Sequence, residues 1–394
     1  MKTQTLLTKE KAFIPLSIPC LNGKEWALVK ECLDTNWVSS VGKFVVQFEK
    51  EIAQFTGSRF AVATSSGTAA LHVSLIVAGI GPDDEVILPT ISFIAPANAI
   101  RYVGAWPVFM DVEPQYWQMD VEKLSEFLHK ECVYKKGKLL NRKTKRVVKG
   151  ILPVHILGHP ADMDPILALA RKFKLVVIED AAEALGTKYK GRHAGTFGKT
   201  GILSFNGNKV ITTGGGGMIL TDDEKFAKKA KYLTTQAKDN DLEGIHNEIG
   251  FNYRLTNIQA ALGVGQLKEI KGYLNKKKEI AHCYEQELKD VVGIQLPRQA
   301  PWAESAFWLF TICVNKNKFS ISSRQLLKKL AEQHIETKPL WHPLYSLPPF
   351  KKCFAYRIEF ADRLYREALS LPSSVHLNPS EQKRVVAVIK DRKV

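Results

Sequence analysis

The sequence has few cysteines, and they are not arranged as metal ligands or as disulfide pairs. Its six cysteines are scattered over 394 residues, and no C-x-x-C motif occurs. In a chain of this length, such spacing is typical of thiols kept reduced in the cytosol. It also argues against a zinc site, which needs clustered ligands. We therefore expect a cytoplasmic protein without a structural metal.

Long apolar runs are missing as well. No segment stays apolar over the ~20 residues that a membrane-spanning helix needs. The N-terminal stretch, MKTQTLLTKEKAFIPLSIP, contains lysines but no sustained apolar segment of the kind found in secretory signals. The sequence therefore predicts neither membrane insertion nor secretion.

Acidic residues are outnumbered by basic ones, and the formal net charge is +16. The basic residues concentrate at 134–149, at 274–279 and in the C-terminal KDRKV, without the interleaved aromatic residues or motifs of nucleic-acid-binding domains. We expect no nucleic-acid partner. A generally positive surface instead favours an anionic, phosphorylated substrate.

Strand-like apolar runs alternate with amphipathic helical stretches over most of the chain. Such runs are FAVAT (60–64), EVILP (85–89), WPVFMDV (106–112) and LVVIED (175–180). This alternation predicts an α/β fold, with a mostly parallel sheet flanked by helices. After about Gly250 the pattern changes to longer helices and isolated strands. We predict an N-terminal segment (1–24) that packs on a small domain, a large domain (25–265) and a smaller α+β C-terminal domain (266–394).

Two local features are predicted within this frame. The basic segment 132–149 is typical of a hairpin that leaves the main fold, and residues 256–291 have the pattern of a long helix. A third feature, in the segment 198–200, excludes an ATPase of the P-loop type. GKT at 198–200 is like the end of a P-loop, but that motif needs a glycine five residues before Gly198, where the chain has His193.

Three stretches contain residues suited to a cofactor site, although each has an ordinary structural explanation. In ATSSGTAALH, Gly67 and Thr68 open a helix whose free N–H groups suit a phosphate, or simply form a helix cap. In VVIEDAAEALG, Asp180 ends a strand and suits a protonated ring nitrogen, or caps a helix. In LSFNGNKVITTGGGG, Lys209 follows a buried strand, in a loop with Ser204, and it is either a nucleophile toward aldehydes or a surface lysine.

Taken together, the three stretches match the needs of pyridoxal 5′-phosphate. That cofactor requires a seat for its phosphate, a carboxylate at its ring nitrogen and a lysine for the Schiff base. The four glycines at 214–217 come after the lysine. We therefore expect them to let the chain fold tightly beneath the lysine-bearing turn.

The same stretches resemble the DegT/DnrJ/EryC1/StrS family of sugar-nucleotide aminotransferases, within fold type I (aspartate aminotransferase-like) of the pyridoxal-phosphate enzymes. The resemblance is carried by SSGTAAL (65–71), EVILPTISFIAPANAI (85–100), PVHILGHPADM (153–163), IEDAAEALG (178–186), SFNGNK (204–209), GGGGMI (214–219) and GFNYRLTNIQAALG (250–263). NWVSSVGKFV (36–45) and LTTQAK (233–238) resemble the LegC-like branch of the family. That branch is associated with 4-amino sugars on the route to legionaminic acid or bacillosamine.

The resemblance implies roles for individual residues. Lys209 would carry the Schiff base, and Asp180 would pair with the pyridine nitrogen. Gly67, Thr68 and Ser204 would bind the phosphate. Phe93 would stack on the outer face of the cofactor. Asn252 would reach the phosphate from a second subunit, so the resemblance implies a homodimer with shared active sites.

The chain departs from the family pattern at two positions. Gly215 stands where many members have glutamate, and Glu183 stands where many have histidine or glutamine. The carboxyl group of Glu183 would lie near the phenolic oxygen of the cofactor, so it needs a salt bridge or a bound proton. Further candidates for substrate contact are Trp37, His155, Lys338 and His342; burial in the core is the alternative for Trp37, and a structural role is the alternative for His155.

The resemblance implies an aminotransferase that converts a nucleotide-linked 4-keto-6-deoxy sugar to the 4-amino sugar for bacterial surface glycans. The first interpretation is UDP-2-acetamido-4-keto-2,6-dideoxyhexose, with glutamate as donor and pyridoxamine 5′-phosphate carrying the amino group. The alternative is a GDP- or dTDP-linked keto sugar, as for a perosamine synthase. A sugar 3-dehydratase would carry histidine in place of Lys209. A non-catalytic regulator usually has a fused DNA-binding module, and no such extension lies outside the matched segments.

Overall fold

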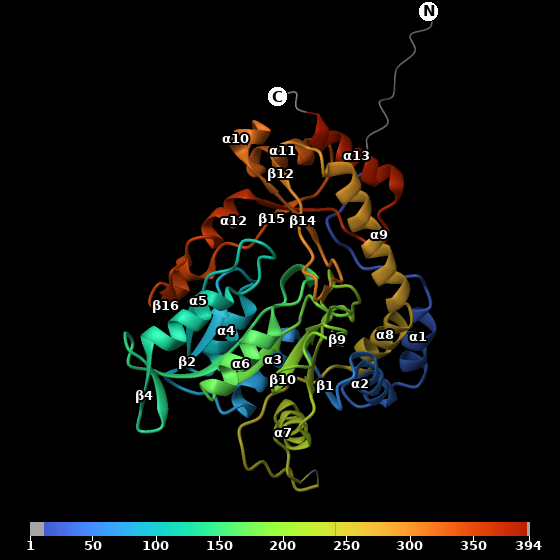
Figure 1. The fold of residues 1–394 in the computed structure, drawn as a ribbon. Coiled ribbons are helices and arrows are strands. Elements are labelled where there is room, and N and C mark those ends of the chain that lie inside the picture. Colours follow the sequence, from blue (N-terminus) through green and yellow to red (C-terminus); the bar gives the residue numbers. More distant parts are fainter. Residues whose placement is uncertain (1–11, 241, 392–394) are drawn as a thin grey trace, which may run out of the picture.

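The computed structural model describes residues 12–240 and 242–391 and has an α/β architecture built on a ten-stranded sheet (Figure 1). Along the sheet the order is β1-β11-β10-β7-β6-β2-β3-β16, and the strands from β10 to β16 run parallel. β11 is antiparallel to both of its neighbours. The strands are β1 (Phe60–Thr64), β2 (Asp84–Pro89), β3 (Trp106–Met110), β6 (Val147–Ile151), β7 (Val176–Asp180), β10 (Thr200–Ser204), β11 (Gly217–Thr221) and β16 (Phe354–Tyr356).

Helices cover the sheet because its strands are apolar on both faces, as parallel strands in a doubly covered sheet are. The helices of this part are α1 (Glu25–Asp34), α2 (Lys43–Thr56), α3 (Gly67–Val77), α4 (Ala95–Tyr102), α5 (Val121–Glu126), α6 (Met163–Lys172), α7 (Glu224–Thr234) and α8 (Asn257–Lys268). Several begin at a side-chain cap, for example Ser66 for α3 and the reciprocal Thr256–Gln259 pair for α8. None of the helices in the described ranges has the length and apolarity of a membrane span.

A four-stranded antiparallel sheet, in the order β12-β14-β17-β15, forms a second layer with its own apolar core. Its strands are β12 (Ile294–Gln295), β14 (Phe310–Val314), β15 (Lys338–Pro339) and β17 (Ala368–Leu371), and the helices around it are α9 (Ile270–Leu288), α10 (Lys316–Phe319), α11 (Ser323–Glu332), α12 (Ala361–Glu367) and α13 (Pro379–Lys390). The described part of the N-terminal segment contacts this layer, where Ile14 bridges Ile335. Residues 1–11 of that predicted segment lie outside the described residues.

Three details refine the sequence-based picture. The basic hairpin is confirmed by β4 (Cys132–Lys135) and β5 (Lys138–Asn141), which pair antiparallel; β5 also pairs with β6, so the hairpin supplies the remaining two of the ten strands. The prediction of a single long helix over 256–291 is wrong, because the helix is interrupted at Glu269. The first part, α8, is buried against α1 and α2, and the second part, α9, leads to the second sheet. β16 lies within the predicted small domain but pairs with β3 of the central sheet.

A buried lysine joins α9 to the second sheet. The Nζ atom of Lys277 donates to the carbonyl oxygens of Trp308, 3.0 Å away, and Ser373, 2.7 Å away, in the segments that flank β14 and β17. Burial lowers the pKa of Lys277 to about 7. A neutral amine has two N–H donors, so these two carbonyl groups satisfy it completely.

The lowered pKa of Lys277 makes its contribution to stability depend on pH. Between about pH 7 and the ordinary lysine value, the unfolded chain binds a proton that the folded chain lacks, so folding becomes more favourable as pH rises. We expect the wild type to gain stability over Lys277→Met by an amount on the order of a few kcal/mol between neutral pH and pH ~10. Denaturant unfolding of the wild type and of Lys277→Met, each at both pH values, measures this difference. The other titrating groups are the same in the two proteins, so their contributions cancel. The exposed Lys278→Met on the same helix should show no such pH dependence.

Candidate active site

A cavity of about 500 Å³ lies at the carboxyl ends of β7 and β10 and at the first turn of α3. Parallel strands leave their ligand-binding loops at this edge of the sheet. The second layer closes the cavity from the other side. Its lining includes Ser66, Gly67, Thr68, Phe93, Asp180, Glu183, Ser204, Lys209, Gly215, Trp308, Lys338 and Trp341.

The first turn of α3 provides an anion seat. The hydroxyl of Ser66 accepts the N–H of Ala69, which leaves the N–H groups of Gly67 and Thr68 without an acceptor among the described residues. Ser204, at the end of β10, lies directly beside Gly67. A Cβ atom added to that glycine would be 3.1 Å from the Ser204 Cβ atom. Two free N–H groups at the positive end of a helix, with hydroxyls close by, suit a phosphate group.

The two carboxylates that end β7 point to opposite sides, as alternate residues of a strand do. Glu179 faces the protein interior and accepts N–H groups of Gly195, Phe197 and Gly198. Asp180 lines the cavity, and its Oδ1 atom accepts the N–H of Ala182 at 3.0 Å. Burial raises the pKa of Asp180, while that N–H and the charge of Lys209 oppose the rise. An acid held in this way suits a cationic ring nitrogen.

Lys209 lies in the turn after β10, with its side chain 13% exposed. Its Nζ atom is 3.4 Å from Oε1 of Glu183 and 4.0 Å from the ring centre of Trp308. The second oxygen of Glu183 accepts the N–H of Leu157 at 2.9 Å. The lysine is therefore a largely buried amine facing the cavity, not a surface residue. In this structure the uncommon Glu183 is satisfied by a salt bridge to Lys209.

The glycine run allows the backbone to approach the anion seat. A Cβ on Gly217 would lie 2.5 Å from the backbone of Ser66 and 2.6 Å from the Gly67 nitrogen. Gly214 has φ +78, a left-handed conformation that favours glycine. The N–H of Phe205 donates to the carbonyl of Gly216, so the run folds back along the end of β10. The expected tight packing is thus found at Gly216 and Gly217, whereas a Cβ on Gly214 or Gly215 would meet nothing closer than 3.9 Å.

The remaining candidates divide into three groups. Phe93 and Lys338 line the cavity with the residues above. His155 does not, because its buried ring is hydrogen-bonded to Glu179 and to the Ala161 N–H. The structural explanation for that histidine is therefore the correct one. Three others lie on the exposed surface outside the cavity lining of their own chain: Trp37, Asn252 and His342.

Two tryptophans of the site were missed by sequence reasoning. Trp308 and Trp341 line the cavity with their rings nearly parallel, 8° apart. The indole N–H of Trp308 donates to the carbonyl of Asn208 at 2.7 Å, which fixes the ring beside Lys209. Trp308 directly precedes β14, in a stretch that predicts only a strand. The sequence around Trp308 does not indicate that this residue will fold over the cavity of the large layer.

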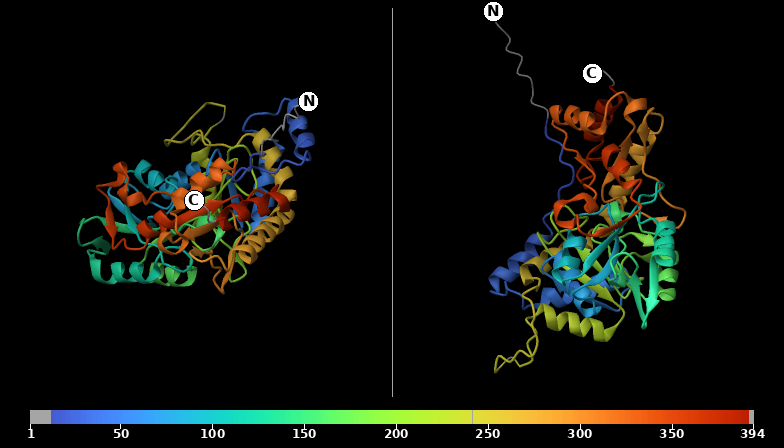
Figure 2. Two further views of the ribbon diagram at one scale, coloured as in Figure 1. Left: turned by 90° about the horizontal axis from the view of Figure 1, so that it is seen from above. Right: turned by 90° about the vertical axis from the view of Figure 1, so that its left-hand side faces the viewer.

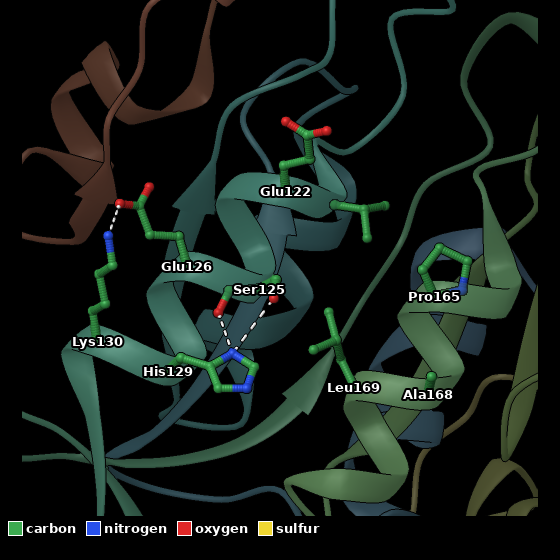
Figure 3. Close-up of a pocket in the computed structure, with 9 residues that line it drawn as sticks. Glu122, Ser125, Glu126, His129, Lys130, Pro165, Ala168 and Leu169 are labelled. Atoms are coloured by element: carbon green, nitrogen blue, oxygen red, sulfur yellow. Dashed lines mark hydrogen bonds and ion pairs between the residues drawn. The ribbon is translucent and has the colours of Figure 1, made fainter.

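A larger hollow, of about 710 Å³, lies between α5 and α6 (Figure 3). Most of its polar side chains are already engaged, both on their own helical segment and with Arg357 and Lys172 from elsewhere in the fold. Glu126 pairs with Lys130, and the imidazole of His129 contacts Ser125. The hollow therefore has no set of polar groups directed at a common point, and the Lys209 cavity is the better candidate for chemistry.

The profile of the DegT/DnrJ/EryC1/StrS aminotransferase family matches residues 19–390. The chain belongs to this family. The aminotransferase is 39% identical to GDP-perosamine synthase of Caulobacter vibrioides over 95% of its length and 97% of that protein. It is 37% identical to the GDP-perosamine synthase of Escherichia coli O157:H7, over 92% and 93% of the two chains. A Streptococcus pneumoniae structure in its PLP form has a TM-score of 0.87 at 25% identity, over 97% and 98%.

The residues of the aminotransferase fit pyridoxal 5′-phosphate. Two unbound N–H groups at a helix start, a buried strand-end acid and a buried primary amine line one cavity. These are the groups that the phosphate, the ring nitrogen and the aldehyde of the cofactor require. The enzyme is a pyridoxal-phosphate-dependent sugar aminotransferase with a mostly parallel α/β fold.

Gly217→Ala should weaken cofactor binding. Its methyl group would overlap the backbone of Ser66 and Gly67 and displace the anion seat, so we expect a loss of affinity of about tenfold or more. Titration of the apoprotein with pyridoxal 5′-phosphate, followed by absorbance, measures the affinity. The matched control is Gly215→Ala, whose methyl group would meet nothing closer than Gln259 at 3.9 Å. Equal affinities for the two variants would contradict this account of the glycine run.

Proposed function

We propose that the enzyme transfers the amino group of glutamate to C4 of a GDP-linked 4-keto-6-deoxyhexose, giving a perosamine-type sugar nucleotide for a surface polysaccharide. The support comes from two relatives named GDP-perosamine synthase that match more than nine-tenths of the chain. Those names favour the GDP alternative over the UDP-linked, legionaminic-type interpretation. The enzyme class rests on the family match.

Each site residue has a task in this reaction. Bound in the cavity, pyridoxal 5′-phosphate supplies an electron sink and carries the amino group between the two half-reactions as pyridoxamine 5′-phosphate. Gly67, Thr68 and Ser204 hold a phosphate, and Asp180 keeps a ring nitrogen protonated. The Nζ atom of Lys209, when free, takes the proton from the α-carbon of glutamate and later gives a proton to C4 of the sugar.

The rim of the cavity is suited to the sugar nucleotide. Lys338 lines the cavity with an exposed side chain, and its ammonium, which pairs with Glu336 at 3.4 Å, would have to exchange that exposed partner for a diphosphate. Phe93 is 56% exposed and offers a ring face at the opening. Trp308 and Trp341 form an apolar wall for the sugar ring.

The substrate is tested by offering three 4-keto sugar nucleotides to the purified holoenzyme with glutamate. We expect the GDP-linked sugar to be aminated with a kcat/KM about tenfold or more above the UDP- and dTDP-linked sugars, since each pocket is built for one set of polar groups. Mass spectrometry identifies the amino product, and Lys209→Ala is the inactive control. Preference for the UDP-linked 2-acetamido sugar would restore the legionaminic-type interpretation. Turnover of none of the three would refute the proposed substrate class.

We also propose a homodimer in which each subunit completes the site of the other. The surface exposes large apolar side chains that a partner could cover, including Trp26 in α1, Trp37 just after it and Ile249 in the loop after α7. That loop extends from the body of the molecule (Figure 2). Asn252 follows it and lies outside the cavity of its own chain, so a partner's cavity is the place for its amide and for the Trp37 ring.

A mixture of two inactive variants distinguishes a shared site from a separate one. Subunits carrying Lys209→Ala and Asn252→Ala are unfolded together in equal amounts and refolded. If Asn252 serves the partner, half the dimers are mixed and each has one intact site, so activity should return to about one quarter of wild type. If Asn252 acts within its own subunit, the mixture will be no more active than the average of the two variants alone.

A further inference from the structure

The carboxyl group of Glu183 is held in a way that directs one oxygen at the reactive amine. Oε2 accepts the N–H of Leu157, and Oε1 lies 3.4 Å from Nζ of Lys209. Leu157 has φ +59, a conformation that non-glycine residues rarely adopt. This backbone turns the Leu157 N–H toward Glu183. One carboxyl oxygen is therefore fixed by the main chain while the other faces the lysine.

The charges around that amine do not balance. Asp180 and Glu183 are both buried carboxyl groups, and Lys209 forms the one salt bridge that Glu183 makes among the described residues. With all three ionised, the cluster would carry a net charge of about −1 in a desolvated site, which is costly. Burial raises the pKa of Glu183, and Lys209 opposes the rise while Asp180 adds to it. Burial and the neighbouring Asp180 therefore both favour the protonated form of Glu183, against the opposing charge of Lys209.

The proposed reaction requires Lys209 in a neutral form. An ammonium has no lone pair and does not remove a proton from carbon. Nζ lies 3.4 Å from Oε1 of Glu183 and 4.0 Å from the centre of the Trp308 ring, whose face binds cations. A proton acceptor must lie within reach of Nζ to release the base, and Oε1 is the acceptor that the structure provides.

We propose that Glu183 is the proton-holding partner of Lys209, taking a proton from the ammonium to free the base and returning it afterwards. In this step an N–H bond of Nζ breaks, an O–H bond forms on Oε1, and both groups become neutral. Desolvation penalises the ion pair more than the neutral pair, which makes the transfer accessible. The proposal rests on the proposed function, since a lysine that never acts as a base needs no such partner.

Glu183→Gln tests the proposal, because glutamine can still accept the Leu157 N–H but cannot hold the proton. The first measurement uses apoprotein, in which Lys209 is labelled with trinitrobenzenesulfonate at a series of pH values and the product is located by peptide mapping. Loss of the neighbouring anion should raise the labelling rate at neutral pH about tenfold. The second follows the half-reaction of the holoenzyme with glutamate in a single turnover. Its rate should fall about 100-fold, with little change in KM.

The expected signature is a slower half-reaction together with a labelling profile that moves to lower pH, because a variant that merely loosens the packing would raise the labelling rate at every pH alike. Glu183→Asp keeps an acid and should recover part of the half-reaction rate. The matched control is Glu85→Gln, another buried carboxyl group at the amino end of β2, which should leave the labelling of Lys209 unchanged. Wild-type rates in both measurements for Glu183→Gln would overturn the proposal. Apoprotein labelling needs no sugar nucleotide, so it stays informative even if the proposed substrate fails.

Discussion

The site depends on the burial of a single amine next to two carboxyl groups. Asp180 ends β7, Glu183 lies in the turn that follows it, and Lys209 comes from the turn after the neighbouring strand β10. Each of these charges would be expensive in isolation at this depth. In the cluster, the charge of Lys209 favours the ionised form of both carboxyl groups, whereas Asp180 favours the protonated form of Glu183. Small rearrangements of protons are then accessible where the chemistry needs them.

The backbone around this cluster is as constrained as the side chains. β11 runs so close to the start of α3 that a single methyl group at Gly217 would meet main-chain atoms. The same glycine run folds back along the end of β10, and Lys209 lies in the turn between them. The anion seat and the amine are thus held at a set separation by one compact piece of chain. A cofactor bound at both ends needs that separation to be constant.

The second layer completes the cavity and couples it to the rest of the molecule. Trp308 contacts Lys209 through its ring, Asn208 through its indole N–H and Lys277 through its carbonyl oxygen. The large layer therefore provides the groups for cofactor chemistry, whereas the second layer provides apolar walls and the exposed Lys338.

Much of this could be predicted from the sequence, because the informative residues are local. A strand followed by small residues and a helix start specifies the anion seat, and the chain order of Asp180, Ser204, Lys209 and the glycines indicates the cofactor and the family. Burial decided the rest. Only the tertiary structure shows that His155 is hydrogen-bonded in the core, that the long helix breaks at Glu269, and that Glu183 faces Lys209. Trp308 is part of the site because its segment, distant in the sequence, folds over the cavity. The pattern of apolar residues in a sequence does not indicate which surfaces will meet after folding.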